Sequence, residues 1–444
     1  MTNALREDSP SLLIRGYGFG AHVWKRARSG ARAVPLRLLG RDALLIRGAD
    51  AVDLFYDNDR IARHGAMPPL IQESLFGHGS VHSLDGDQHR HRKATFLDVA
   101  YEDEHVDRFT PLLEREWQAE LDEWLHSGAR SAYDAAVGAF GRASMTWAGL
   151  PGTSAAKTRW AARLAQIVDG FGAPYSPEYL LALANRHWSD RHAEQLIDAV
   201  RAGTLDAPDG TALHEWAWHT EPDGNLVPEW AWPNARNGEL LPAKLAGIEL
   251  QNSIRPMIAV ARFVAFAAKE LHDHPEWRTR IGAETHNRGS LTGGRVATAF
   301  AQEIRRTAPF VPMLPGWATT DIDHDGQHLP AGGRVLLDVL GTDTDDESWA
   351  RAGEFDPSRF LDVDDYEAIT TFVPHGGGDV ASGHRCPGEK LAIAGLAAAT
   401  AALSDPRVTI LDAGLHVNRR RLPTKPASGG QVRTNGAPSG CPVH

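Results

Sequence analysis

The chain has 444 residues, of which 42% are hydrophobic, and a formal net charge of −11 at pH 7. This acidic balance argues against a nucleic-acid-binding protein, and two cysteines, Cys386 and Cys441, are too few for disulfides to organise the fold, which favours a reducing compartment. The N-terminal residues have no apolar signal core and no apolar stretch approaches the roughly 18 residues of a membrane span, so we expect a cytoplasmic protein without a membrane anchor.

Helices dominate the predicted elements. Two short strands are expected within residues 34–46, around a turn at Gly40. Helical patterns follow at 49–56, 86–97, 110–125, 157–168, 193–202, 240–271 and 296–307, with strands at 335–339 and 407–411. The pattern predicts a mainly α fold with small β-sheets, in a single domain over residues 1–444 because no linker divides the chain. Within it we expect a β-rich N-terminal lobe at about 34–60, a C-terminal hairpin at about 407–422 and a loose tail at 424–444.

A tandem duplication precedes the longest predicted helix. Residues 214–227 and 228–241 share Glu, Trp, Ala, Trp, Gly and Leu at a spacing of 14. Two copies are too few for a solenoid, so we interpret the segment as a surface excursion. Its tryptophans either mark a partner-binding patch or, more commonly, pack the excursion onto the body of the protein; they are Trp216, Trp218, Trp230 and Trp232.

A glycine-rich loop near the C-terminus places one cysteine directly before an Ala/Leu helix pattern. It reads Phe372-Val-Pro-His-Gly-Gly-Gly-Asp-Val-Ala-Ser-Gly-His-Arg-Cys386-Pro-Gly-Glu. A thiolate at Cys386 can ligate a heme iron, and glycines let the backbone approach a flat macrocycle where a Cβ would clash. The positive N-terminus of the following helix is expected to lower the pKa of the thiol. The alternative is a buried cysteine in a tight turn.

Two further signals stand in the same order as in one known family. Glu303 and Arg306 lie one turn apart on the helix predicted before Pro309, so they can pair on one face, and Arg359 follows in Asp-Pro-Ser-Arg-Phe. Together with the cysteine loop they resemble the Glu-x-x-Arg helix, the later arginine and the heme-ligating cysteine of the cytochromes P450. The resemblance implies the P450 fold, an α-rich triangular prism. It also implies heme b with Cys386 as the axial iron ligand, above a structural lock of Glu303, Arg306 and Arg359.

The long central helix departs from most P450 monooxygenases. Those enzymes carry an acid and a threonine over the heme to deliver protons to oxygen, whereas residues 255–269 contain no Asp, Glu or Thr. Instead Arg255 and Pro256 interrupt a largely apolar stretch, and a proline inside a helix costs about 3 kcal/mol. The functional interpretation is a guanidinium fixed over the heme, which holds a substrate carboxylate through two charge-assisted hydrogen bonds. The alternative is a kink with a snorkelling arginine.

Arg255-Pro256, the expanded cysteine loop and residues 74–93 together resemble one P450 subfamily, the bacterial fatty-acid peroxygenases, which include alkene-forming fatty-acid decarboxylases. The similarity runs from about residue 34 to about 417; the duplication and the tail from 423 depart from it. The resemblance implies oxidation of a fatty acid at its α and β carbons by hydrogen peroxide, with no obligatory redox partner. The substrate carboxylate held by Arg255 would then move a proton between the peroxide oxygens, in place of the missing acid–base pair.

The resemblance also assigns side chains around the cofactor and the substrate. Arg255, Pro256 and His82 would form the catalytic group. His82 matches the histidine of the alkene-forming decarboxylase, and an imidazole pKa near neutrality would favour loss of carbon dioxide; the alternative is a plain hydrogen bond to a propionate or water. The heme propionates would be bound by His89, Lys93, His384 and Arg63. The acyl channel would be lined by Ile71, Leu75, Phe76, Phe310 and Met313, whose alternative role is core packing.

Two other functions compete with this interpretation. A reductase-dependent P450 monooxygenase of another carboxylic acid would need an electron-transfer partner. A non-catalytic heme sensor or carrier would supply a second axial ligand from the protein and would leave Arg255-Pro256 without a role. Turnover with peroxide alone separates the peroxygenase from both.

Overall fold

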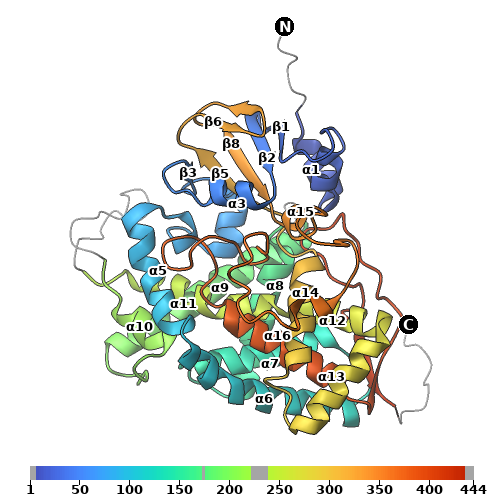
Figure 1. Cartoon of the computed structure of the whole chain (residues 1–444). Coiled ribbons are helices and arrows are strands. Elements are labelled where there is room, and N and C mark those ends of the chain that lie inside the picture. Colours follow the sequence, from blue (N-terminus) through green and yellow to red (C-terminus); the bar gives the residue numbers. More distant parts are fainter. Residues whose placement is uncertain (1–6, 173–175, 222–238, 436–444) are drawn as a thin grey trace.

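The structure is a computed structural model that describes residues 7–172, 176–221 and 239–435. A large helical body carries a smaller, sheet-rich part at one end (Figure 1). The helices are α1 Ser9–Arg15, α2 Gly18–Trp24, α3 Ala49–Phe55, α4 Pro69–Ile71, α5 Gly86–Ala100, α6 Asp103–His126, α7 Ala132–Trp147, α8 Ser154–Gly170, α9 Pro177–Arg201, α10 Ala212–Trp218, α11 Ala243–Ala259, α12 Ala261–Asp273, α13 Pro275–Arg288, α14 Arg295–Thr307, α15 Val339–Asp343 and α16 Glu389–Leu403. The strands are β1 Ala33–Leu38, β2 Arg41–Ile46, β3 Ile61–Ala62, β4 Arg130–Ser131, β5 Met313–Ala318, β6 Ile322–His324, β7 Gln327–Leu329, β8 Arg334–Asp338, β9 Val408–Ile410 and β10 Gln431–Thr434. The predicted mainly α class with small sheets is confirmed.

The larger sheet has five strands in the order β1-β2-β8-β5-β3. β1 and β2 form the expected antiparallel hairpin, and β2 then pairs in parallel with β8, which lies far away in the sequence. Val52 and Phe55 of α3 pack with Leu44 and Val335 in the core of this sheet. Because β5 and β8 come from residues 313–338, the predicted lobe at 34–60 is only part of the sheet-rich region.

The C-terminal strands correct the predicted hairpin and loose tail. β9 pairs not with a neighbouring strand within 407–422 but with β10, and β10 also pairs with β4. β10 is therefore the middle strand of a three-stranded sheet. Just before it, the carbonyls of Gly430 and Gly429 accept hydrogen bonds of 2.7 and 3.0 Å from the N–H groups of Ala132 and Tyr133 at the start of α7. The strand partners are remote in the sequence, so the local pattern contains no signal for them.

The main core joins α6, α7, α11, α12 and α16. Trp117, Phe140, Phe263 and Leu396, one from each of four of these helices, are among its fully buried side chains. α16 is apolar on every side, as expected of a helix surrounded by protein. Within the described segments, none of the helices combines the length and apolarity that crossing a bilayer requires.

The central helix predicted at 240–271 is divided in two. α11 ends at Ala259 and α12 begins at Ala261, with Val260 between them. Pro256 explains the break, because it has no N–H to donate to the carbonyl of Asn252 one turn earlier and its ring crowds that carbonyl. The interruption lies beside Arg255, so the helix bends where the candidate anion-binding side chain is placed.

The first copy of the duplication is not a peripheral excursion. It folds in part as α10, whose Trp216 is completely buried and donates a 2.9 Å hydrogen bond from Nε1 to Ser253 Oγ on α11. Trp218 is 45% exposed. Trp230 and Trp232 lie outside the described residues. Trp216 therefore packs onto the body of the protein. Among the described tryptophans of the duplication, Trp218 is the one exposed enough to belong to a partner-binding patch.

Candidate active site

A mostly apolar cavity of about 350 Å³ lies between α5, α11 and the cysteine loop. Its wall includes most of the residues predicted for the site: Arg63, Leu75, Phe76, His82, His89, Lys93, Arg255, Pro256, Phe310, His384 and Cys386. Ile71 and Met313 are not in the wall of this cavity, so their assignment to the acyl channel stays a prediction. Met313 instead packs against the core on the α2 side of the five-stranded sheet. The fold thus gathers side chains from distant segments into one cavity.

Arg255 is a buried cation with an unused donor in this wall. Its side chain is buried, and its Nη2 donates a 2.6 Å hydrogen bond to Asn252 Oδ1, one helical turn earlier. Its Nη1 has no hydrogen-bond partner among the described residues. Burial, together with the nearby charge of Arg186, lowers the pKa of Arg255 to about 9, while Asp190 and Glu249 raise it. The guanidinium therefore stays charged at neutral pH and can bind an anion in the cavity.

A chain of buried polar side chains connects Arg255 to α5 and to the residues just after α10. Asn252 Nδ2 donates 2.8 Å to Glu249 Oε2. Glu249 also accepts a 3.1 Å bond from Arg92 Nη1 on α5, and Arg92 forms a second ion pair with Glu221, just after α10. All five side chains are under 5% exposed. The sequence reasoning missed this network; its local part was visible in the spacing of 249, 252 and 255, which places three polar residues on one helix face.

His82 lies in the wall beside Phe76, with ring centroids 4.2 Å apart. Its Nδ1 is buried and has no partner among the described residues. Burial and then the positive charge of Arg255 lower the pKa of His82 to about 3. The expectation of a near-neutral pKa is therefore wrong: the imidazole is uncharged at neutral pH because a second cation beside Arg255 would be unfavourable in this buried space.

Cys386 lies in the cavity wall on a tight loop. Its backbone N–H donates a 3.1 Å bond to the carbonyl of His375. Burial and the Glu389 carboxylate raise the pKa of the thiol, whereas Lys93 and the backbone N–H of Gly388 lower it. The predicted lowering by the helix N-terminus is thus outweighed by desolvation. A thiolate here depends on a bound metal, which deprotonates a coordinating thiol outright.

The loop glycines are required by packing against α3. A Cβ on Gly377 would lie 2.8 Å from Val373 Cγ1 and 3.0 Å from Val52 Cγ1. A Cβ on Gly378, which has a φ of +73°, would lie 2.9 Å from Tyr56 Cγ. The described contacts of these two glycines are therefore with α3, with Tyr56 directly after it and with the loop itself. Because the glycines have no side chain, the cysteine loop packs closely against the sheet-rich part.

The predicted propionate ligands gather beside Cys386. The rings of His89 and His384 stack with centroids 3.9 Å apart, and burial lowers the pKa of His89 to about 3 and that of His384 well below its usual value. Arg63 Nη2 is buried without a described hydrogen-bond partner. Lys93 Nζ donates 3.2 and 2.5 Å bonds to the carbonyls of Gly383 and Arg385. A thiol for iron and several N–H donors for carboxylates thus face one cavity, so the residues present fit a heme group.

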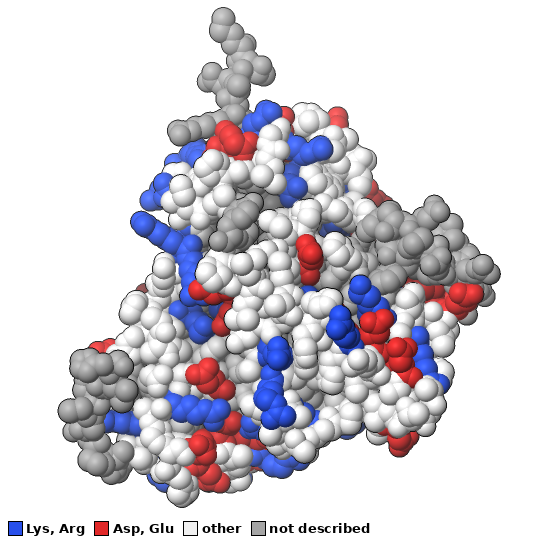
Figure 2. Space-filling view, turned by 180° about the vertical axis from the view of Figure 1, so that it is seen from behind, with Lys and Arg blue, Asp and Glu red and all other residues white. Residues whose placement is uncertain are grey.

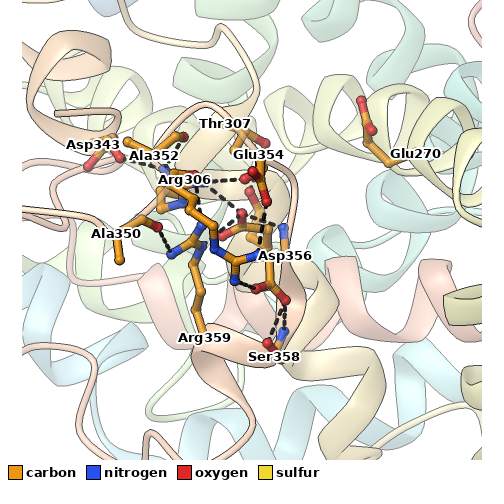
Figure 3. Close-up of polar contacts among 12 residues, drawn as sticks. Glu270, Arg306, Thr307, Asp343, Ala350, Ala352, Glu354, Asp356, Ser358 and Arg359 are labelled. Carbon is orange, nitrogen blue, oxygen red and sulfur yellow. Dashed lines mark hydrogen bonds and ion pairs between the residues drawn. The ribbon is translucent and has the colours of Figure 1, made fainter. Parts of the chain in front are cut away.

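The predicted charged lock forms around Arg306 and Arg359 (Figure 3). Arg306 Nη2 and Nε donate 2.7 and 2.8 Å bonds to the two carboxylate oxygens of Glu303, and both side chains are completely buried. Arg359 Nε lies 3.5 Å from Glu303 Oε1. Arg306 also donates to the carbonyls of Asp343, Ala352 and Glu354. Because nearly every donor has a protein acceptor, the arrangement stabilises the scaffold rather than binding a ligand.

His219, next to the buried network, gives a test of the acid stability of the fold. Burial and then Arg92 lower its pKa from 6.5 to about 3. Between these pH values the unfolded chain binds a proton that the folded chain does not, so this group costs stability as the pH falls below 6.5. His219→Gln should reduce the decrease of the free energy of unfolding on acidification by up to about 1.4 kcal/mol per pH unit, as measured by urea unfolding.

The exposed His126 provides the matched control for that substitution. His126→Gln makes the same chemical change on the surface of α6 and should leave the pH dependence as in the wild type. Equal slopes for His219→Gln and the wild type would contradict the argument.

The family model for cytochrome P450 matches residues 295–403. Cytochrome P450SP alpha (CYP152B1) in complex with (R)-ibuprophen superposes with a TM-score of 0.85 at 33% identity, over 96% of this chain and 98% of that one. Ligand-free cytochrome P450 OleT gives 0.84 at 28% identity over 96% of both chains, and an OleT variant in complex with arachidonic acid gives 0.84 at 27%.

Curated relatives match over a much shorter region. The 3-hydroxyindolin-2-one monooxygenase of Zea mays is 36% identical over 100 residues, which are 21% of this chain and 18% of that protein. Cytochrome P450 714B3 of Zea mays is 30% identical over 132 residues, or 28% of this chain and 24% of that protein. These alignments thus span about a quarter or less of the relatives.

Proposed function

The chain belongs to the cytochrome P450 family, and we propose that it is a fatty-acid peroxygenase, which uses hydrogen peroxide to oxidise fatty acids at the α and β carbons. The observation that carries the proposal is the buried guanidinium of Arg255, with its free Nη1, in the same cavity as Cys386. The ligands named for two of its structural neighbours, (R)-ibuprofen and arachidonic acid, are both carboxylic acids, which supports an anionic head group at this position.

Cys386 would hold heme b through its sulfur, with Arg63, His89, His384 and Lys93 as the ligands of the propionates. Heme with a thiolate ligand supplies the iron that activates peroxide, because the thiolate pushes electron density toward O–O cleavage. His89 and His384 would act as neutral N–H donors, since burial keeps their pKa values low. Lys93 also fastens the cysteine loop to α5 through the carbonyls of Gly383 and Arg385.

Arg255 would fix the head group and thereby decide which carbons react. Asn252, itself bonded to Glu249, holds Nη2, whereas Nη1 has no described partner and would orient a carboxylate in the cavity. The bound carboxylate would also serve as the base that moves a proton between the two oxygens of hydrogen peroxide, since residues 255–269 offer no Asp, Glu or Thr for that task. A dedicated redox partner is then unnecessary. A cytoplasmic location is part of the proposal, since two cysteines are too few for disulfides to organise the fold, which fits a reducing compartment.

Product analysis tests the proposal directly. The purified heme-loaded protein is incubated with a saturated fatty acid and hydrogen peroxide, without a reductase, and the products are separated by gas chromatography and mass spectrometry. We expect terminal alkene, 2-hydroxy acid and 3-hydroxy acid in some ratio. Turnover that requires a reductase and NAD(P)H would favour the monooxygenase, and heme binding without any turnover would favour a sensor or carrier.

His82 is proposed to direct the reaction toward decarboxylation to the terminal alkene. Burial and then the charge of Arg255 lower its pKa to about 3; a carboxylate bound to that arginine would offset the second of these causes, so the imidazole would accept a proton more readily than in the empty cavity. Glutamine is unable to do so. His82→Gln should therefore lower the ratio of alkene to hydroxy acid several-fold while peroxide consumption continues.

The control for this substitution is Phe76→Leu, which changes the neighbouring ring without removing a titratable group. An unchanged ratio in His82→Gln, or a wild type that makes hydroxy acids alone, would show that His82 has no part in the choice of product and that the enzyme is a hydroxylase.

A further inference from the structure

The buried chain of polar side chains that ends at Arg255 consists of charges of alternating sign, joined at one point by an amide. Its members, in order, are Arg255, Asn252, Glu249, Arg92 and Glu221, and each is under 5% exposed. On the face of the molecule shown in Figure 2, acidic and basic side chains are interspersed among uncharged ones, and water stabilises each of them. A charge in the interior depends on its partners instead, so a change at one end of the buried chain alters the bonds along it.

Glu221 and Glu249 share the guanidinium of Arg92. Arg92 bonds to Glu221 through Nη2, and its Nη1 donates 3.1 Å to Glu249 Oε1. The other oxygen of Glu249, Oε2, accepts a 2.8 Å bond from Asn252 Nδ2. Without the carboxylate of Glu221, Arg92 would have Glu249 as its one described acidic partner and would draw both of its oxygens into the bidentate geometry that arginine favours. Asn252 would then lose the acceptor Oε2.

Asn252 passes this arrangement on to Arg255. Its Nδ2 donates to Glu249 and, at 3.3 Å, to the carbonyl of Phe76, whereas its Oδ1 accepts the 2.6 Å bond from Arg255 Nη2. Among the described residues, this oxygen is the one that accepts a hydrogen bond from the Arg255 side chain. The orientation of the amide therefore fixes the orientation of the guanidinium and leaves Nη1 for a carboxylate.

The first copy of the tandem duplication holds Glu221 in place. The N–H of Glu221 donates 3.1 Å to the carbonyl of Glu239, and the N–H of Leu241 donates 2.8 Å to the carbonyl of His219, so the two flanks of the segment are bonded to each other. At the repeat spacing of 14, the residue of the second copy that corresponds to Glu221 is Ala235. The carboxylate therefore belongs to the first copy alone.

We propose that Glu221 is a positioning residue for Arg255. Because it holds Arg92, Glu249 stays bonded to Asn252, which presents the guanidinium to the fatty-acid carboxylate in one orientation. That orientation sets which carbon of the bound acid lies nearest the point of oxidation, so Glu221 acts on the ratio of α- to β-oxidised products without touching the substrate. The inference rests on the proposed function and gives a part in it to a residue outside the cavity wall.

Product analysis and fatty-acid binding by the full-length holoprotein test the inference. Glu221→Gln keeps the size of the side chain and removes its charge. We expect kcat/KM to fall about tenfold and the ratio of α- to β-oxidised products, with terminal alkene counted as β-oxidised, to change at least about threefold. The Kd of a saturated fatty acid, measured by calorimetry without peroxide, should rise about threefold. Glu221→Asp restores the charge and should return the product ratio toward that of the wild type.

Glu120→Gln provides the matched control. Glu120 is a buried acid on α6 that pairs with Arg130 and Arg142, and it is not in the cavity wall. Both glutamine variants break a buried ion pair, so both should lower the free energy of unfolding in urea. The product ratio and the Kd should change in Glu221→Gln and stay as in the wild type in Glu120→Gln.

A double-mutant cycle identifies the route between the two residues. Asn252→Ala removes the amide, so adding Glu221→Gln to it should leave the product ratio and the Kd of the Asn252→Ala variant unchanged. Additive effects of the two substitutions, or a wild-type ratio and Kd in Glu221→Gln, would overturn the inference. A wild type that binds the fatty acid but does not turn it over with peroxide would refute the proposed function, and the Kd values would then decide the positioning role by themselves.

Discussion

Replacing Arg255 with leucine is expected to abolish peroxide-driven turnover of fatty acids while the protein still folds and binds heme. The guanidinium of Arg255 is buried in the cavity wall, and its Nη1 has no hydrogen-bond acceptor among the described residues. It therefore provides the charge and the donors that a carboxylate needs. Two charge-assisted hydrogen bonds are worth about 3–6 kcal/mol together, so kcat/KM should fall by at least about 100-fold. Steady-state kinetics with peroxide in excess measure the loss, and heme absorbance confirms incorporation.

Two further variants separate anion binding from the simple removal of a buried charge. Arg255→Lys should restore activity only in part, because an ammonium does not form the bidentate pair. Arg262→Leu also removes a buried arginine from the cavity wall, but that guanidinium already pairs with Asp169 and bonds to the carbonyl of Thr424. It should lower stability and retain fatty-acid binding. Full activity in Arg255→Leu would rule out the proposed role.

Replacing Cys386 with serine is expected to remove the absorbance band that carbon monoxide gives with thiolate-ligated reduced heme. A serine hydroxyl is a poor iron ligand and does not push electron density as a thiolate does, so peroxide-driven oxidation should fall to background. The difference spectrum of the reduced protein with carbon monoxide measures the ligand independently of turnover. Retention of the thiolate band would assign the ligand to Cys441, which lies outside the described residues.

The charged lock was predicted from sequence motifs together with the resemblance to the cytochromes P450. Glu303 and Arg306 form their pair within one turn of one helix, and Arg359 approaches the same carboxylate. Arg255 stands out in the sequence because an apolar helix isolates it, and the structure buries it in the same cavity as Cys386. The pairing of Glu303 with Arg306 depends on helical spacing, and Arg255 is an unusual residue in an apolar segment, both of which a single sequence displays; the approach of Arg359 was implied by the resemblance.

Tertiary environment decided the features that the sequence could not provide. Met313 is apolar and close to the site in sequence, but its strand turns it toward another core. The pKa of His82 was expected near neutrality but lies at about 3, and the pKa of Cys386 was expected to be lowered but is raised. In both cases desolvation exceeds the local helix and charge effects that a sequence suggests. The pairing of Arg92 with Glu221 joins residues 129 positions apart, and neither residue lies in a sequence motif that predicts the pair.

The position of β10 in its sheet has a consequence for the order in which the molecule is made. β10 follows every other described element in the sequence, yet it lies between β4 and β9, and the two glycines directly before it supply the carbonyls at the start of α7. During translation, β4 and the first turn of α7 therefore wait for roughly three hundred further residues before their backbone partners leave the ribosome. We expect nascent chains that stop before Gln431 to remain open at this corner, where proteases and chaperones find an unpaired strand edge.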